Sequence, residues 1–269
     1  MRYYKKAKNE ILRFDQDNSD RKDPSGLDVI STLSHFSLIT YAIDPAKVRA
    51  YVHPRFELDL ITDKKGERKA LLSVVPFYDS DFRFVRFPYL GFSFGQTNYR
   101  IYVIDSKTGE RVVWFLGTTL DSWSVFLPRL FWKLPWHPGK IRFQTEWNQA
   151  KKKYDLYRMK TKSDWASVDL ELEDLGVPAK VPDGFSDLET SLVVLTHPFE
   201  GYFYRRDNHL GNYAVWHEKL SPTEGKIVKA EFGLLDKLGL VPYENQLKPH
   251  SVWIQPDTQF TVYLPPRKV

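Results

Sequence analysis

The residues best suited to chemistry lie on one predicted strand, residues 96–103. Side chains on a strand alternate between its two faces, so Gln96, Asn98, Arg100 and Tyr102 share one face. If this face lines an enclosed cavity, its amide, guanidinium and phenol groups could bind a carboxylate or another anion by paired hydrogen bonds. The alternative is a solvated outer face with the intervening apolar residues packed inward, and periodicity alone favours this alternative.

Two further residues could take part in acid–base chemistry. His217 lies in a predicted strand, and an imidazole exchanges protons near neutral pH, although a buried histidine with satisfied hydrogen bonds is the alternative. Asp121 could supply an acid to the same pocket, but its position before a predicted helix is also typical of a helix N-cap. We predict no specific catalytic residue. The candidate ligand-binding residues are Arg100, Asn98, Tyr102, His217 and Asp121.

Several other chemistries are excluded or disfavoured by what the sequence lacks. There are no cysteines, which excludes disulfides, thiolate metal sites and a cysteine nucleophile. The sequence has no glycine-rich phosphate loop, no Gly-x-Ser-x-Gly nucleophile motif and no histidine pair at metal-ligand spacing. We therefore predict neither a metal nor a cofactor.

The charge pattern gives little support to a nucleic-acid partner. The net charge is +5, from 39 Lys and Arg against 34 Asp and Glu. Lysines cluster at residues 5–8 and 151–153, where surface turns are expected, and solvated turns explain such clusters. The predicted partner is a small molecule rather than a nucleic acid, and the sequence leaves the oligomeric state open.

The location of the protein is predicted from two absent signals. Residues 1–23 lack the apolar core of a signal peptide, and no window approaches the roughly 18 uncharged apolar residues of a membrane span. We therefore expect a cytoplasmic protein without a transmembrane segment. The aromatic segment at residues 126–136 could lie on a membrane surface, but we favour its packing against the core.

The elements that must position the candidate residues are mostly short strands. Aromatic residues make up 15% of the chain, and aromatic side chains favour strands and large cores. Turn residues separate about eleven to thirteen predicted strands, and the hairpin of residues 97–104 and 111–118 is the clearest. No βαβ pattern occurs. We therefore predict an α+β fold, mainly antiparallel β, as a barrel or sandwich with a few short helices.

The predicted domain organisation is simple. Residues 1–30 are polar and rich in turn formers, so we expect an N-terminal arm whose order the sequence leaves open. A single β-barrel domain follows over residues 31–269. Asp44 and Pro45 are typical of a helix start. The predicted helices cover residues 45–51, 120–133, 187–196 and 232–238, and the longest predicted loop covers residues 78–95.

The order of several short motifs resembles a known family. The run QTNYRIYV at residues 96–103 resembles the E-N-x-R-x-Y-V strand of the YqjF-like proteins, the bacterial family named domain of unknown function 2071. Each motif is short, so the resemblance depends on their shared order over most of the chain. The other motifs are short runs in a fixed order. They are HFSL, then DP, then P within residues 35–54; VWFL, then LD within 113–121; LPW at 134–136; VLTH, then YFY within 194–204; and AVWHEKL at 214–220.

This resemblance implies a fold and argues against one mechanism. The family is similar in fold to acetoacetate decarboxylase, which implies a closed β-barrel with an internal site. The chain has Gln96 and Thr97 before Asn98 where the family has a glutamate, and His197 stands in place of another glutamate, so roles of those acids are not carried over. The Schiff-base lysine of the decarboxylase is expected near residues 117–125, which contain no lysine. The resemblance therefore disfavours Schiff-base decarboxylation.

Three functions remain open. The first is a small-molecule-binding barrel protein, which could be an enzyme, with an anionic or carbonyl ligand held by Arg100 and Asn98. The second is a decarboxylase-like lyase that uses another acid–base pair. The third is a non-catalytic interaction or membrane-peripheral protein that uses the aromatic segment. A cavity lined by Arg100 and His217 would favour the first two, whereas exposed Trp132 and Trp136 would favour the third.

Overall fold

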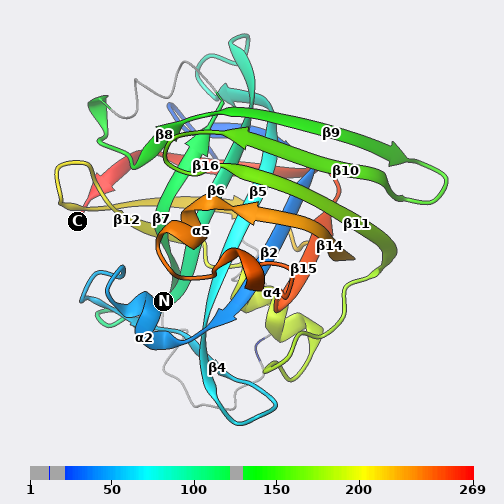
Figure 1. Ribbon diagram of the computed structural model, residues 1–269. Helices are drawn as coiled ribbons and strands as arrows, with labels where there is room; N and C mark the ends of the chain where they lie inside the picture. The colour runs from blue at the N-terminus through cyan, green and yellow to red at the C-terminus, as the bar shows by residue number, and fades with distance from the viewer. Residues whose placement is uncertain (1–11, 13–21, 122–129) are drawn as a thin grey trace.

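A computed structural model describes Leu12, residues 22–121 and residues 130–269 (Figure 1). Strands form most of this structure, and the described strands belong to one continuous sheet. In chain order they are β1 (Val29–Ser34), β2 (Phe36–Ile43), β3 (Phe56–Leu58), β4 (Leu60–Thr62), β5 (Arg68–Phe84), β6 (Gly91–Asp105), β7 (Arg111–Leu120), β8 (Trp136–Pro138), β9 (Lys140–Asn148), β10 (Lys153–Lys162), β11 (Val168–Pro178), β12 (Glu200–Tyr204), β13 (Leu210–His217), β14 (Thr223–Phe232), β15 (Ser251–Gln255) and β16 (Thr258–Lys268).

The described helices are short, and three of them begin within one residue of the predicted starts. The Asp44 carboxylate accepts a hydrogen bond from the Ala46 N–H at 2.8 Å, and the Asp187 carboxylate accepts one from the Thr190 N–H at 2.9 Å. Both aspartates are therefore side-chain N-caps, and the helices predicted there and before Gly239 are confirmed. The helices are α2 (Pro45–Arg49), α4 (Leu188–Thr196), α5 (Gly233–Lys237) and the 3₁₀ helix η2 (Tyr243–Asn245).

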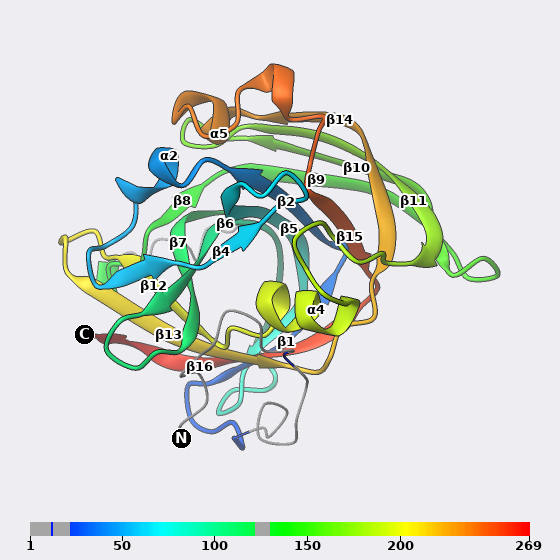
Figure 2. The same cartoon turned by 90° about the horizontal axis from the view of Figure 1, so that it is seen from below.

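Seven strands close into a barrel, in the order β5, β6, β7, β12, β13, β16, β1 and back to β5 (Figure 2). Neighbouring strands are antiparallel except β7 and β12, which run parallel and pair Val113 with Gly201 and Phe115 with Phe203. The parallel pairing of β7 and β12 requires a glycine at position 201, since a Cβ atom there would lie 2.3 Å from Cε2 of Phe115. The predicted fold class, a mainly antiparallel closed barrel with a few short helices, is confirmed.

A second layer of strands covers one side of the barrel. β2 continues the sheet from the first half of β5, and β15, β14, β11, β10 and β9 follow in that order (Figures 1 and 2). An apolar core fills the space between the layers. Within it, the rings of Tyr99 and Trp165 meet edge to face with centroids 5.5 Å apart, and Gly95 lies against Ile141 of β9. The outward face of β6 is therefore buried by this second layer.

The hairpin between β5 and β6 corrects the loop predicted over residues 78–95. β5 continues to Phe84 and β6 begins at Gly91, and the two strands remain paired along this extension. The rings of Phe82 and Phe94 lie 5.3 Å apart across the pair. Because cross-strand aromatic pairs stabilise a sheet, the hairpin stays paired although charged residues interrupt its apolar pattern.

Two other boundaries differ from the predicted ones. The first strand begins at Val29, inside the region predicted as an arm, and it pairs with both β16 and β5. The helix predicted over residues 120–133 falls largely on residues 122–129, which lie outside the described residues, and Leu120 ends β7. Among the helices that the structure describes, none has the length and apolar character needed to cross a membrane.

Candidate binding site in the barrel

The barrel encloses a cavity of about 110 Å³. Residues from all seven barrel strands line it, and most of them are apolar. An apolar cavity with a few converging polar groups is typical of a small-molecule site. The polar residues of its wall are Ser31, Asp79, Gln96, Asn98, Arg100, Thr196, Tyr213 and His217.

Arg100 lines the cavity, and its guanidinium contacts the last turn of α4. This helix lies at one end of the barrel (Figure 2). The Nη2 atom of Arg100 donates a hydrogen bond to the Leu195 carbonyl at 2.7 Å, and its Nε donates one to the Tyr102 hydroxyl at 3.3 Å. The last carbonyls of a helix have no partner inside the helix, and a cation is favourable beside them. The Tyr102 hydroxyl donates to the same carbonyl at 3.1 Å. Tyr102 is therefore a positioning residue for Arg100 rather than part of the cavity wall.

The charge of Arg100 has only neutral partners. They are the carbonyl, the hydroxyl and the face of the Tyr102 ring, whose centroid lies 5.5 Å from the guanidinium carbon. In the described part of the chain, no carboxylate forms an ion pair with it. Among the described hydrogen bonds of Arg100, Nε and Nη2 donate and Nη1 does not, so the N–H groups of Nη1 are available to an anion in the cavity. An anion there would supply the opposite charge with which charged groups inside proteins are usually paired.

Two amides lie beside Arg100 on the inward face of β6. The Oδ1 atom of Asn98 accepts hydrogen bonds from Gln96 Nε2 at 2.9 Å and from the Thr118 hydroxyl at 2.8 Å. With Oδ1 occupied, the Nδ2 donors of Asn98 remain for a ligand. The polar face of this strand thus lines an enclosed space, which is the orientation that periodicity alone did not favour.

His217 lies on the cavity wall, but its nitrogens face the backbone. Nε2 is 2.7 Å from the Thr196 carbonyl and Nδ1 is 2.7 Å from the Glu218 carbonyl, while the ring stacks on Phe260 with centroids 4.4 Å apart. Burial and, to a smaller extent, the charge of Arg100 lower the pKa of His217 on balance, although the two carbonyl contacts raise it. This geometry favours the structural alternative, in which His217 joins β13 to the end of α4.

The cavity wall also contains a carboxyl group that the sequence reasoning missed. Asp79 of β5 is 4% exposed, and its Oδ1 accepts a hydrogen bond from the Ser31 hydroxyl at 2.9 Å. Burial raises the pKa of Asp79 to about 7, and the hydrogen bond from Ser31 opposes only part of this rise. Asp79 was hidden inside the predicted loop. Its place in the alternation Val75, Phe77, Asp79 is the signal that could have revealed it.

The comparison with protein families agrees with this architecture. The sequence model of the family DUF2071, described as "Uncharacterized conserved protein (COG2071)", matches residues 31–259. The chain belongs to this family. The resemblance to domain of unknown function 2071 is thereby confirmed. No curated protein matches the chain.

Solved structures similar to this DUF2071 chain include several enzymes. Acetoacetate decarboxylase from Legionella pneumophila is 15% identical with a TM-score of 0.57, and the match covers 98% of each chain. The enduracididine biosynthesis enzyme MppR complexed with pyruvate is 12% identical with a TM-score of 0.54, covering 92% of this chain and 91% of that chain. An acetoacetate decarboxylase-like enzyme from Sphingomonas wittichii is 10% identical with a TM-score of 0.55, covering 91% and 94%. At these identities the likeness shows the fold alone.

Lysines and metal ligands do not gather at the described wall of the cavity. None of the lining residues that the structure describes is a lysine, and Lys133, which follows the segment where the resemblance would place one, lies outside the wall. Residues 122–125 of that segment lie outside the described residues. No group of three His, Cys, Asp or Glu side chains suited to a metal occurs among the residues with described positions. The described wall thus offers no amine for a Schiff base.

Asp121 and two tryptophans lie apart from the polar groups of the site. Asp121 is exposed and is not among the lining residues; its Oδ2 accepts a hydrogen bond from the Ile141 N–H at 3.1 Å, which joins the end of β7 to β9. We therefore leave Asp121 out of the candidate site. Trp132 and Trp136 are partly buried against the apolar core, and Trp136 lines the cavity. They are not the exposed pair that would favour a surface helix.

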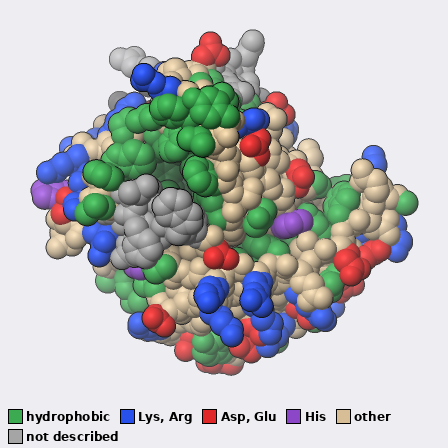
Figure 3. Space-filling view, turned by 90° about the horizontal axis from the view of Figure 1, so that it is seen from above, with side chains coloured by type: hydrophobic (Ala, Val, Ile, Leu, Met, Phe, Trp, Pro, Cys, Tyr) green, Lys and Arg blue, Asp and Glu red, His purple; other side chains and the backbone are tan. Residues whose placement is uncertain are grey.

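Hydrophobic side chains do gather on one face of the molecule, which Figure 3 shows from above. The most exposed large hydrophobic residues of the described chain are Tyr89, in the turn between β5 and β6, and Phe131, with 78% and 70% of their surface accessible. Both are more exposed than Trp132 and Trp136, which are partly buried.

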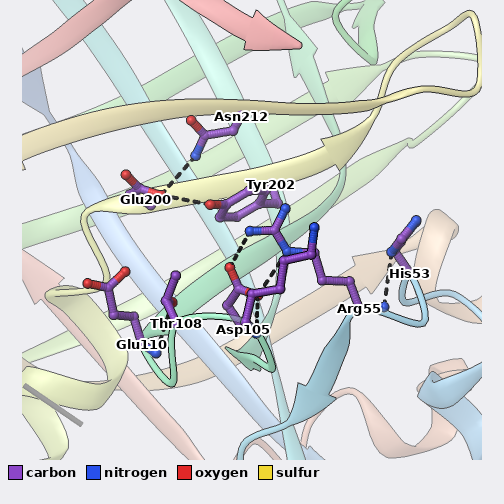
Figure 4. Close-up of polar contacts among 9 residues, drawn as sticks. His53, Arg55, Asp105, Thr108, Glu110, Glu200, Tyr202 and Asn212 are labelled. Carbon is purple, nitrogen blue, oxygen red and sulfur yellow. Dashed lines mark hydrogen bonds and ion pairs between the residues drawn. The ribbon is translucent and has the colours of Figure 1, made fainter. Parts of the chain in front are cut away.

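A second polar cluster lies outside the cavity, beside β12 and the turn between β6 and β7 (Figure 4). Arg55 donates to Asp105 through Nε at 2.9 Å and through Nη2 at 2.5 Å, and its guanidinium lies over the rings of Phe56 and Tyr202. Glu200 accepts a hydrogen bond from the Tyr202 hydroxyl at 2.9 Å. Because these groups satisfy one another, we interpret the cluster as a structural clamp between the segment before β3 and the β6–β7 turn.

Proposed function

We propose that this chain binds a small carboxylate or carbonyl compound inside the barrel, with Arg100 as the anchor for its anionic group. The observation that carries the proposal is the enclosed guanidinium, which has neutral partners only and N–H groups left over. An arginine binds a carboxylate through two parallel hydrogen bonds. The Nδ2 group of Asn98 supplies a further donor on the same face of β6.

The size of the cavity suits a ligand of this class. A cavity of about 150 Å³ in another protein accepts benzene, which has six heavy atoms, and this cavity measures about 110 Å³. The MppR structure complexed with pyruvate is an example of a small keto acid bound by a protein of similar fold. Both points support a short acid over a nucleotide or a lipid.

A lyase that acts on such a ligand is the second candidate. Asp79 favours it, because a buried carboxyl group with a pKa of about 7 can give or take a proton near neutral pH. In this candidate function Asp79, rather than a lysine, exchanges the proton. Turnover of a keto acid, followed by proton NMR, would separate it from binding alone.

The anchor role of Arg100 can be tested by ligand binding. We expect pyruvate, acetoacetate or a short alkanoate to raise the melting temperature of the wild-type protein, because a ligand of the native state stabilises it by mass action. Arg100→Ala should raise the dissociation constant, measured by calorimetry, by about 10- to 100-fold, since hydrogen bonds to charged groups contribute about 1.5–3 kcal/mol. The variant should fold, because the Leu195 carbonyl keeps the Tyr102 hydroxyl as a donor.

The matched control is Arg142→Ala, which removes an exposed arginine from β9. It should bind the same compounds with wild-type affinity. Equal affinity of the Arg100→Ala and wild-type proteins, or no binding of any of the compounds, would contradict the proposed function.

A further inference from the structure

The two ends of the barrel are covered differently. α4 lies at one end, where Arg100 contacts the Leu195 carbonyl (Figure 2). At the opposite end β5, β7, β12 and β16 finish and β1, β6 and β13 begin. We call this opposite end the rim. Its described segments are residues 22–28 before β1, residues 85–90 between β5 and β6, residues 130–133, residues 205–209 between β12 and β13, and residues 264–269 at the end of β16.

The turn between β5 and β6 presents large hydrophobic side chains to solvent. Tyr89 is the most exposed of them, and Leu90 is 51% exposed. The turn also contacts the segment that carries the exposed Leu27, because the Arg86 N–H donates a hydrogen bond to the Gly26 carbonyl at 3.0 Å. The hydrophobic groups of these two segments therefore belong to one part of the rim.

A further exposed hydrophobic group comes from another segment of the rim. Phe131 belongs to residues 130–133, which are joined to residues 205–209 by a hydrogen bond of 2.8 Å from the Arg206 N–H to the Lys133 carbonyl. Exposed hydrophobic surface of this kind marks a site of contact with a membrane or with another protein.

Positive charge surrounds these hydrophobic groups. The arginines and lysines of the rim segments are Lys22, Arg86, Lys133, Arg205, Arg206, Arg267 and Lys268, and the carboxylate side chains are Asp23, Asp28 and Asp207. Asp28 is buried and accepts a hydrogen bond from the Leu264 N–H, and Asp207 forms an ion pair with Arg205 at 2.9 Å. Among the described residues, no carboxylate forms an ion pair with the remaining cations of the rim. The rim therefore has an excess of positive charge.

An anionic membrane surface fits both properties. Aromatic and aliphatic side chains enter the headgroup region of a bilayer, and each lysine or arginine near anionic lipid adds attraction. Lysine, in contrast, is depleted in interfaces between proteins. The turn between β5 and β6 also projects beyond the barrel (Figure 1), so it can enter a lipid interface without a matching groove on a partner.

We propose that the rim docks on an anionic membrane surface. Tyr89 and Leu90 enter the headgroup region, Arg86 and the other cations of the rim contact lipid phosphates, and the end that carries α4 faces away from the membrane. This inference does not depend on what binds inside the barrel.

The test is flotation of the full chain with two kinds of vesicle, phosphatidylcholine alone and equal parts of phosphatidylcholine and phosphatidylglycerol. We expect the protein to float with the mixed vesicles and to stay behind with phosphatidylcholine. Added salt should release part of the bound protein, because salt screens exposed charges. No flotation with the mixed vesicles, or equal flotation with both kinds, would overturn the inference.

Variants of the turn locate the contact. Serine at both Tyr89 and Leu90 should raise the dissociation constant for the mixed vesicles by about tenfold or more, because two apolar groups no longer leave water. Arg86→Gln should raise it by about fivefold, the effect of one cation at an anionic surface. The matched controls are Arg68→Gln, at the exposed start of β5, and Leu247→Ser, at an exposed position before β15. Both controls should bind as the wild type, and wild-type affinity of both turn variants would contradict the proposal.

A fluorescent label reports the insertion directly. The chain has no cysteine, so Tyr89→Cys gives a single attachment site for a polarity-sensitive dye. On mixed vesicles the emission of this dye should shift to the blue and gain intensity, because the dye leaves water, whereas the same dye on Leu247→Cys should keep its spectrum. If the labelled protein floats with the vesicles while the spectrum at position 89 stays unchanged, another face of the molecule binds the membrane and the proposed docking is wrong.

Discussion

Replacing Asp105 with asparagine is expected to lower the free energy of unfolding by about 3–4 kcal/mol, because breaking a buried ion pair leaves the partner charge uncompensated. The Asp105 side chain is 1% exposed and that of Arg55 is 12% exposed. Both carboxylate oxygens accept hydrogen bonds from Arg55, and Oδ1 also accepts one from the Lys107 N–H at 3.0 Å. The asparagine amide would place an N–H group against the Arg55 donors.

The measurement is urea unfolding at several pH values. Burial alone would raise the pKa of Asp105, but the hydrogen bonds from Arg55 and Lys107 and their charges lower it on balance. A carboxyl group with a lowered folded-state pKa stabilises the protein above its unfolded-state pKa of about 4 and loses this contribution as pH falls below it. The difference between wild type and Asp105→Asn should therefore shrink below about pH 4.

Asp155→Asn is the control, since the Asp155 side chain is exposed and pairs with Lys151 at the surface. Exposed ion pairs contribute little, so this variant should unfold with the wild-type midpoint. A wild-type midpoint for Asp105→Asn as well would show that the clamp formed by Arg55 and Asp105 does not stabilise the fold.

The second large effect is expected at Trp114. Truncating this residue to alanine should cost about 3–5 kcal/mol, the range for a large aromatic side chain removed from a packed core. Trp114 is 1% exposed, and its ring contacts Phe56 and Tyr204 with centroids 5.5 Å and 4.9 Å apart. It lies on the outward face of β7, so its removal leaves the cavity wall unchanged.

Two measurements separate this effect from damage to the site. Denaturant unfolding gives the loss of stability, and Trp147→Ala on β9 serves as the control because Trp147 is 37% exposed. Ligand affinity, measured well below the unfolding midpoint, should stay near the wild-type value in Trp114→Ala. If Trp114→Ala lowered the free energy of unfolding by less than about 1 kcal/mol, the outer core would have to fill the space left by the indole ring. The cost of a cavity depends on how far its surroundings relax.

The sequence was sufficient for the local features whose signals are short-range. The N-cap at Asp44, the helix over residues 187–196 and the hairpin that carries Arg100 all follow from capping residues, turn residues and alternation. The order of family motifs predicted the closed barrel. These signals depend on a few neighbouring residues or on a pattern spread along the chain.

The rest of the site depends on contacts between distant segments. Alternation could not tell which face of β6 is the interior, because the second layer buries the opposite face through residues such as Tyr99. Asp79 stayed hidden because the charged residues after it are typical of a loop, and its partner Ser31 is 48 residues away. The Nε2 atom of His217 contacts the Thr196 carbonyl because α4 packs beside β13, and this packing is a contact between distant segments.

The burial of both faces of β6 has a consequence for how this protein can diversify. A change in side-chain volume on either face of β6 shifts a backbone that contacts both the cavity and the outer core. β6, the strand that carries Arg100, therefore tolerates little variation. β16 is freer, because Val262 and Leu264 line the cavity while Pro265 and Arg267 are exposed. Under the proposed function, relatives that bind different compounds should therefore differ in sequence along β16 and retain the sequence of β6.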